Sequence, residues 1–445
     1  MINLPEDFLS EMKELLGNEY DDFLSSYSFE QKKAFRINSV KSTTFDLTFF
    51  GKNKVPYTQN SYYLENDSLG SSPFHHAGAV YIQEPSAMIP ALVLNPPKGS
   101  RVLDMCAAPG GKSGQLAELV GEDGVLVSNE INLSRSRVLL GNVERLGLKN
   151  TVVTNLPPKE IAKNLKGWFD AVLVDAPCSG EGMFRKNPDA IGEWTKERSE
   201  SSGERQKEIL LESAKCLKEG GYLVYSTCTF SKCENEDVIQ TLLDTGEFEL
   251  CPITDEFPHE NGKDEKGYTA RLYPHKMQGE GHFVAKLKRI APNSTTDKKS
   301  MVRDLNKKEE NALKPFLDVL TNPPRPKILG SNVIFPPKII PPLPYGIIGC
   351  GVKVGEVGDR FIPHHQVFSA FGRSFKNQIN LSASDKRVNM YLRGEEIDTI
   401  CDDEESAKTP QNGWAAVLIE NCPVGGAKVS GEKAKNHYPK GLRTR

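Results

Sequence analysis

The 445-residue sequence lacks the features of a membrane or secreted protein. No run of apolar residues is long enough to cross a bilayer, which takes about 20 such residues in a helix. The amino-terminal stretch MINLPEDFLSEMKELLG is acidic and amphipathic, whereas a secretory signal peptide begins with basic residues followed by an apolar segment. We therefore expect a cytoplasmic protein that does not associate with membranes.

Paired cysteines are absent, because none of the nine cysteines forms a Cys-x-x-Cys pair with another. The cysteines are spread too widely for a disulfide framework, and they lack the spacing of structural zinc sites. We expect no bound metal, and individual thiols are free to take part in chemistry. Five cysteines fit best as small buried side chains: Cys216, Cys251, Cys350, Cys401 and Cys422.

A general excess of basic charge is also absent, since the formal net charge is −3. This balance argues against a protein that coats nucleic acid through charge alone. The charge is uneven, however, because the residues from 426 to the end hold six lysines and arginines beside a single acid, Glu432. The rings of His437 and Tyr438 lie within this basic run and are suited to stacking on bases. Phosphate binding and a solvated tail are both open interpretations of this segment.

From residue 101 onward, short apolar runs alternate with stretches of helical periodicity. Strands are expected at 101–105, 125–130, 151–155, 171–175 and 221–227, with a closing strand at 282–289. Helices are expected near 112–120, 132–146, 158–165 and 196–218. This alternation predicts a parallel α/β sheet with crossover helices, and such a sheet binds its ligands beyond the carboxyl ends of the strands.

The length of the chain predicts more than one hydrophobic core. Residues 1–95 are expected to form an α+β extension and residues 96–290 the α/β core. Residues 291–345 are first polar and lysine-rich and then proline-rich, which favours a linker and extended, turn-rich chain. Residues 346–445 are expected to form a small β-containing domain.

The first candidate site is the run of small residues after the first predicted strand, Asp104-Met105-Cys106-Ala107-Ala108-Pro109-Gly110-Gly111-Lys112-Ser113. Paired glycines let the backbone pass close to a ligand, and the helix that follows offers unpaired N–H groups. A phosphate-binding P-loop would need glycine where this chain has Cys106, so a nucleoside triphosphate is disfavoured. Glu130 ends the second strand, where a doubly wound sheet places the carboxylate that holds ribose hydroxyls, although acids there also cap helices.

Two cysteines follow strands into polar loops at the same predicted edge. Cys178 lies in Val174-Asp175-Ala176-Pro177-Cys178-Ser179-Gly180-Glu181-Gly182, and Cys228 lies in Tyr225-Ser226-Thr227-Cys228-Thr229-Phe230. Substrate and solvent have access to such loops, so both thiols are candidates for chemistry. Cys106 is expected to pack the turn instead.

The motifs CAAPGGK, DAPCSGEG and STCT resemble the signature motifs of the RNA cytosine-5 methyltransferases. The stretches Tyr81-Ile82-Gln83-Glu84-Pro85-Ser86-Ala87 and Gly279-Glu280-Gly281-His282-Phe283 also resemble segments of that family. The tail Lys435-Asn436-His437-Tyr438-Pro439-Lys440-Gly441-Leu442-Arg443 resembles bacterial members that modify small-subunit (16S) ribosomal RNA. The resemblance implies a Rossmann-like class I methyltransferase core, an RNA-binding amino-terminal extension and a carboxy-terminal PUA-like RNA-binding domain. It also implies that the chain is a monomer whose cofactor is S-adenosylmethionine and whose partner is 16S rRNA or the small ribosomal subunit.

The resemblance also implies the roles of individual residues. Cys228 is expected to attack the cytosine ring, Cys178 to assist breakdown of the adduct, and Asp175 to hydrogen-bond the ring. DNA cytosine-5 enzymes use the Pro-Cys cysteine for attack, so that arrangement would reverse the two thiols. The expected cofactor-binding residues are Cys106, Ala107, Ala108, Pro109, Gly110, Gly111, Lys112, Glu130, Asn155 and Asp175.

Several alternatives are open from the sequence. Transfer RNA is the main rival substrate, and a non-catalytic RNA-binding module or a methyltransferase for small molecules or proteins belongs to another class. Relatives carry Gly-Trp-Gly-Lys where this chain has Gly425-Gly426-Ala427-Lys428, a departure that bears on the target. Arg271 and His275 either contact RNA or form structural ion pairs.

Overall fold

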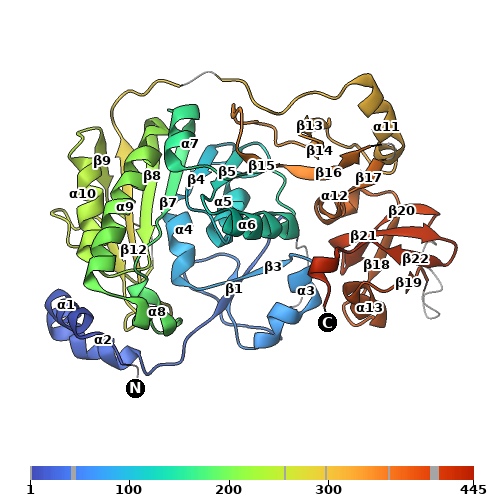
Figure 1. Cartoon of the computed structure of the whole chain (residues 1–445). Helices are drawn as coiled ribbons and strands as arrows, with labels where there is room; N and C mark the ends of the chain where they lie inside the picture. The colour runs from blue at the N-terminus through green and yellow to red at the C-terminus, as the bar shows by residue number, and fades with distance from the viewer. Residues whose placement is uncertain are drawn as a thin grey trace.

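The computed structural model describes residues 3–41, 47–254, 257–295, 298–358, 361–400 and 410–444 (Figure 1). Its centre is a ten-stranded sheet in the order β10-β11-β12-β8-β7-β4-β5-β6-β15, with β9 paired to β12. The parallel strands are β4 (Arg101–Asp104), β5 (Val125–Asn129), β6 (Thr151–Thr154), β7 (Phe169–Asp175) and β8 (Leu217–Thr227). The antiparallel strands are β9 (Phe248–Cys251), β10 (Glu260–Asn261), β11 (Ala270–Leu272), β12 (His282–Arg289) and β15 (Ile347–Cys350).

Helices cover both faces of this sheet. One face packs against α4 (Ile89–Leu94), α5 (Gly111–Val120) and α6 (Leu133–Leu146), and the other against α7 (Pro158–Asn164), α9 (Lys196–Lys215) and α10 (Glu236–Leu243). The central strands β5 and β6 are buried along their whole length and β7 along most of it, and their sequences are largely apolar, as is typical of parallel sheets. The predicted strands and helices between 101 and 227 and the closing strand at 282–289 are confirmed.

The amino-terminal part contains the predicted helical start and extended stretch. Strand β1 (Ala34–Ile37) lies between β2 (Ser61–Tyr63) and β3 (Val80–Gln83), and the short helix α3 (Pro73–His76) precedes β3. Helices α1 (Glu6–Leu16) and α2 (Tyr20–Ser26) pack beside the core through a buried aromatic cluster. The cluster joins rings of the two helices to rings in the loops after β7 and β8: Phe8, Phe23, Phe184, Trp194 and Phe230.

Some of the residues after 290 belong to the core, and others form separate sheets beyond it. Helix α11 (Lys307–Leu317) is followed by a small sheet of β13 (Lys327–Leu329), β14 (Asn332–Phe335), β16 (Val352–Val357) and β17 (Phe361–Pro363). Strand β15, between β14 and β16 in the chain, pairs with β6 of the central sheet. The predicted domain boundaries after residues 95, 290 and 345 are still predictions. Strand pairing crosses the boundary at residue 345.

The carboxy-terminal sheet has the order β18-β20-β21-β22-β19. Its strands are β18 (Gln378–Leu381), β19 (Ile397–Asp398), β20 (Gly413–Ile419), β21 (Cys422–Ser430) and β22 (Lys433–Asn436), and its helices are α12 (His365–Phe371) and α13 (Lys386–Arg393). Figure 1 places this sheet on the side of the core where β3, α3 and α6 lie. The predicted fold class, an α/β core with an α+β extension and a β-rich carboxy-terminal domain, is confirmed.

Lys41 joins three parts of the molecule. Its side chain is 3% exposed, and its Nζ donates to the carbonyl oxygens of Ala77, Arg145 and Pro423 and to the hydroxyl of Ser369 at 2.6–3.0 Å. Burial, the largest influence, lowers the pKa of Lys41 to about 8. The amine therefore links the amino-terminal part, α6 and the carboxy-terminal domain through hydrogen bonds to three backbone carbonyls and one hydroxyl.

The cysteines outside the candidate loops differ in exposure. Cys216, Cys350 and Cys422 are buried as expected, whereas Cys251 is partly exposed. Cys401 lies outside the described residues. Within the described ranges, no helix combines the length and apolar character required to cross a membrane.

Candidate active site

The loops that carry the predicted motifs meet at the carboxyl edge of the central sheet. The turn Cys106–Gly110 follows β4 and leads into α5, which begins at Gly111. Gly110 has φ +113°, a left-handed conformation that favours glycine, and a Cβ at Gly111 would lie 3.0 Å from the ring of Tyr81. The paired glycines therefore fit a tight turn, which presents the amino-terminal N–H groups of α5 to this edge.

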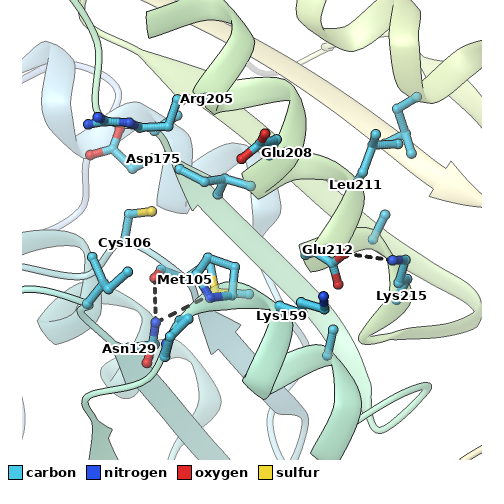
Figure 2. Close-up of a pocket in the computed structure, with 18 of the residues that line it drawn as sticks. Met105, Cys106, Asn129, Lys159, Asp175, Arg205, Glu208, Leu211, Glu212 and Lys215 are labelled. Carbon is cyan, nitrogen blue, oxygen red and sulfur yellow. Dashed lines mark hydrogen bonds and ion pairs between the residues drawn. The ribbon is translucent and has the colours of Figure 1, made fainter.

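A cavity of about 1770 Å³ opens beside this turn. Its first part is lined by residues at the strand ends: Met105, Cys106, Ala108, Asn129, Glu130, Asp175, Cys178 and Cys228. It continues between α7 and α9, where its lining includes Lys159, Glu208 and Glu212 (Figure 2). The cavity is therefore larger than a cofactor site, and only its strand-end part contains the predicted residues.

Glu130 lies where a ribose-binding acid is expected. It lines the cavity and is 3% exposed, with Oε1 accepting a hydrogen bond from the Asn132 amide at 2.8 Å. Its Oε2 lies 3.4 Å from the Arg135 guanidinium. The carboxylate is thus fixed at the end of β5 and retains acceptor capacity for a ligand.

Asn155, the other predicted residue of this region, is placed differently. Its Nδ2 donates to the carbonyl oxygens of Glu130 and Ile131 at 2.7 and 2.8 Å. It is not among the residues that line the cavity. In this structure the side chain supports the turn after β5, and its contact with a cofactor is still only a prediction.

The two candidate thiols lie together. Cys178 Sγ and Cys228 Sγ are 3.2 Å apart, and the backbone amide of Cys228 is directed at Cys178 Sγ at 3.4 Å. Both side chains are partly exposed and line the cavity. The hydrogen bond with Cys228, followed by burial, raises the pKa of Cys178 well above its ordinary value. Cys178 therefore keeps its proton at neutral pH, and either sulfur can be the donor in the contact between them.

An ion pair lies next to the thiols. Lys112 Nζ donates to Asp175 Oδ2 at 2.8 Å, and the hydroxyl of Ser226 donates to Asp175 Oδ1 at 2.7 Å. Burial alone would raise the pKa of Asp175, but the charge and hydrogen bond of Lys112 and the hydrogen bond of Ser226 hold it below its ordinary value. Burial alone would lower the pKa of Lys112, but Asp175 raises it. Both groups are therefore charged at neutral pH.

Buried carboxyl groups hold the two cysteine loops together. Glu234 accepts hydrogen bonds from the Ser179 amide at 2.9 Å and from the side chains of Ser199 and Gln206 at 2.8 Å. Glu181 accepts from the Phe230 amide at 2.9 Å and from Trp194 Nε1 at 3.0 Å. Sequence reasoning quoted Glu181 within its motif without assigning it a role and missed Glu234. The only available signal for Glu234 was an acid six residues after Cys228.

The structure distinguishes the alternatives for Arg271 and His275. Arg271 is 1% exposed, and its Nε donates to Glu236 at 2.8 Å while its Nη1 donates to the Phe230 carbonyl at 2.7 Å. His275 Nε2 lies 3.3 Å from Glu19 of the amino-terminal part. Both residues therefore have structural partners. The RNA-contact alternative for Arg271 does not fit its burial.

The carboxy-terminal tail requires one correction. Tyr438 is 3% exposed and packs against Tyr391 and His365, so its ring is not free to stack on a base. The ring of His437 lies instead 4.9 Å from that of Trp414. Trp414 is paired across the sheet with Lys428, and Lys428 with Lys435. The rings and cations of this region therefore gather on one face of the β20-β21-β22 sheet.

The glycine at residue 426, where relatives carry tryptophan, has a local explanation. A Cβ at Gly426 would lie 2.6 Å from the ring of Phe368, and the Gly426 carbonyl accepts hydrogen bonds from Tyr391 and His437. The ring of Phe368 on α12 thus occupies the space that a side chain at residue 426 would need. A tryptophan there would clash with it.

The fold and the loops at this sheet edge are those of the Rossmann-like class I methyltransferases, a class that uses S-adenosylmethionine. The residues present fit that cofactor, since the glycine turn and Glu130 border one cavity. Beneath the turn, Asp104 Oδ1 is a buried acceptor without a hydrogen-bond partner among the described residues. Burial, the largest influence, raises the pKa of Asp104 to about 7.

Three family models match consecutive parts of the chain. They describe the N-terminal domain of 16S rRNA methyltransferase RsmF (residues 4–85), 16S rRNA methyltransferase RsmB/F (residues 91–288) and the methyltransferase RsmF PUA domain (residues 378–444). The chain therefore belongs to the 16S rRNA methyltransferase RsmB/F family.

Individual relatives agree with this family. A ribosomal RNA small subunit methyltransferase F from Vibrio cholerae is 38% identical over 315 residues, 66% of this chain and 66% of that protein. The protein of the same name from Salmonella paratyphi A is 35% identical over 308 residues, 65% of this chain and 64% of that protein. The matches thus span just under two thirds of these relatives. The solved structure of a methyltransferase homolog protein from Pyrococcus horikoshii is 31% identical, with a TM-score of 0.58 over 65% of this chain and 96% of that chain.

Proposed function

We propose that the protein methylates carbon 5 of a cytosine in 16S ribosomal RNA, using S-adenosylmethionine and a covalent adduct between Cys228 and the base. The observation that carries this proposal is the pair of thiols 3.2 Å apart at the edge of the cavity, beside the Lys112–Asp175 ion pair. The names of the relatives support ribosomal RNA as the substrate. The cytoplasm, where ribosomal subunits are made in bacteria, is the location that this substrate implies.

The two thiols have different parts in this chemistry. Carbon 5 of cytosine is a weak nucleophile, but a thiolate added at carbon 6 makes the ring electron-rich at carbon 5. A free thiol with a pKa of about 8.5 is only about 3% thiolate at pH 7. Because Cys178 keeps its proton and its sulfur lies 3.2 Å from Cys228 Sγ, it can donate a hydrogen bond to a Cys228 thiolate. This arrangement supports Cys228 as the attacking group.

Asp175 and Lys112 are suited to hold the ring. The Asp175 carboxylate can accept a hydrogen bond from the exocyclic amine, since each of its oxygens accepts a single bond from the described residues. Nitrogen 3 gains electron density during attack and needs a donor, which the Lys112 ammonium can supply. The ion pair is thus complementary to the polar edge of cytosine.

The remaining steps return the thiol. The cofactor supplies a methyl group that carbon 5 takes with the electron pair created by attack at carbon 6. A proton then leaves carbon 5, the bond between carbon 6 and Cys228 Sγ breaks, and its electron pair stays on sulfur. Cys178 lies within reach of the same adduct, and we assign it to assisting this breakdown.

The proposed cofactor site comprises the turn from Cys106 to Lys112 together with Glu130, Asn155 and Asp175. Its strand-end position matches the rule that open α/β sheets bind ligands beyond the carboxyl ends of their strands. The protein is proposed to act as a monomer and without a metal ion.

Two single variants test the thiol assignment. Cys228→Ala should abolish methyl transfer without forming a covalent protein–RNA species. Cys178→Ala should still attack and methylate but then stall, so a slowly migrating complex should appear on a denaturing gel with unmodified 16S rRNA and S-adenosylmethionine. A trapped complex with Cys228→Ala and none with Cys178→Ala would reverse the roles. Cys233→Ala, a partly exposed thiol outside the larger cavity, is the matched control.

The substrate is tested separately by comparing RNAs. The target base must be unpaired or flipped, which costs a few kcal/mol at most where the local structure is open. Methyl incorporation should be faster into unmodified small ribosomal subunits or 16S rRNA than into unmodified transfer RNA. A transfer RNA rate well above the ribosomal rate would contradict the proposed substrate, whereas the thiol assignment would still stand.

A further inference from the structure

A second cavity lies beside Cys178, along the loop after β7. Its volume is about 440 Å³, and it meets the larger cavity at Cys178. Its wall is formed by the loop after β7, by α8 (Asp189–Glu193) and by the first turn of α9. This volume falls within the range of about 300–1,000 Å³ that is typical of pockets for small ligands. A ligand group placed there would lie directly beside the reacting atoms.

The loop that forms this wall is firmly anchored. Arg185 is 8% exposed; its Nη1 donates to the Ser26 carbonyl at 3.1 Å, its Nη2 to the Gly279 carbonyl at 2.8 Å, and its Nε lies 3.2 Å from Glu280. The amides of Lys186 and Asn187 both donate to the Met183 carbonyl, at 2.9 and 2.7 Å. The backbone beneath the cavity is therefore held from two sides, and the next side chain along, Lys186, is exposed.

The charges at this cavity suit an anion. The Lys186 amine makes no hydrogen bond or ion pair with any other described residue. Arg198 Nη1 lies 3.1 Å from the Glu193 carboxylate and donates to the Glu193 carbonyl, so the carboxylate in the wall is already neutralised. The cavity therefore presents one unpaired cation and one fork with further N–H groups, Nε and Nη2, available.

We propose that this cavity holds the nucleotide adjacent to the target cytosine, with its phosphodiester on Lys186 and Arg198. The inference rests on the proposed function, since a base held at Cys228 must continue into ribose and phosphate on both sides. The cofactor turn borders the larger cavity, whereas the second cavity shares Cys178 with it and none of its described lining residues belongs to that turn. Asn187 at its rim offers an amide that can pair with a base edge.

The test uses the full chain and unmodified 16S rRNA. Lys186→Met, Arg198→Met and the double variant are compared with Lys314→Met, which removes an exposed lysine of α11 that lines neither cavity. RNA binding is measured at several salt concentrations without cofactor, so the result does not depend on catalysis. Methyl transfer by the unmodified protein is measured in parallel and tests the proposed function on its own.

We expect each single variant to flatten the logarithmic salt slope by about 0.7, and the double variant by about 1.4, as for contacts to single-stranded RNA. The KM for RNA should rise on the order of threefold for each exposed contact, while kcat stays unchanged. Salt slopes and KM values that match those of Lys314→Met would overturn the proposal. All three positions, Lys186, Arg198 and Lys314, are exposed, so loss of folding does not confuse the comparison.

Discussion

Removal of the Glu130 carboxylate should abolish cofactor binding while leaving RNA binding intact. The side chain is 3% exposed, lines the cavity and ends β5. If both ribose hydroxyls donate to it, each bond to the charged group contributes about 1.5–3 kcal/mol. Loss of both is therefore worth about 3–6 kcal/mol, or roughly a hundredfold to ten-thousandfold in Kd. Glu130→Ala should show this full loss, and Glu130→Gln a smaller one, since the amide keeps one acceptor.

The fold should survive these changes. Helix α6 keeps its cap, because the Asn132 side chain accepts from the Arg135 amide independently of Glu130. Glu122→Ala, which removes a surface carboxylate paired with Lys149, is the matched control. Binding of S-adenosylmethionine is measured by isothermal titration calorimetry, and RNA binding by filter retention. An unchanged cofactor affinity in a folded Glu130→Ala protein would refute the placement of the ribose at this acid.

Two further predictions concern Lys41 and the carboxy-terminal sheet. Lys41→Met should leave four buried acceptors without their donor, and it should also change the pH dependence of stability. Because burial lowers the pKa of Lys41 to about 8 from 10.5, the unfolded chain binds more protons between those values. The free energy of unfolding should therefore rise with pH there by about 3 kcal/mol more in the unmodified protein than in Lys41→Met. Thermal unfolding of both proteins from pH 7 to pH 10 measures this, and a difference that stays constant with pH would contradict it. On the carboxy-terminal sheet, Lys428→Met with Lys435→Met should flatten the salt slope of RNA binding by about 1.4. Trp414→Ala should weaken binding by about 1–3 kcal/mol if a base stacks there. Filter binding in which all these variants match the unmodified protein would exclude this face from the RNA interface.

The carboxy-terminal test uses point changes because the structure rules out truncation. Residues 426–445 include most of β21 and all of β22, and Val429, Ala434 and Tyr438 belong to the domain core. Deleting them would remove the core of the domain together with its cations. A basic run in a sequence therefore does not show which of its residues face solvent.

The sequence predicted the central sheet well for a physical reason. Strands buried on both faces are continuous apolar runs, as in Ala171–Asp175, and glycine turns mark where helices begin. Parallel strands share one carboxyl edge, so the meeting of Cys178, Cys228 and Asp175 followed from their places after strands. The separation of the thiols depends on the loop conformations. No local pattern encodes those conformations.

The features that the sequence did not predict depend on contacts between residues far apart in the chain. Arg271 and Glu236 are 35 residues apart, and either could equally have faced solvent on local pattern alone. Glu234 acts through the backbone of a loop more than 50 residues earlier, and Lys41 through acceptors from four separate segments. Such contacts are fixed by tertiary packing.

Strand β15 has a consequence for how the chain reaches its native state. It covers the open edge of β6, although nearly 200 residues separate the two in the chain. Until it emerges from the synthesising ribosome, the catalytic sheet ends in unpaired N–H and C=O groups, a template for pairing with other chains. A fragment that stops at residue 290 would keep that exposed edge permanently. The edge of β6 is therefore covered only once residues beyond 345 have been synthesised, and a shortened chain would need another way to protect it.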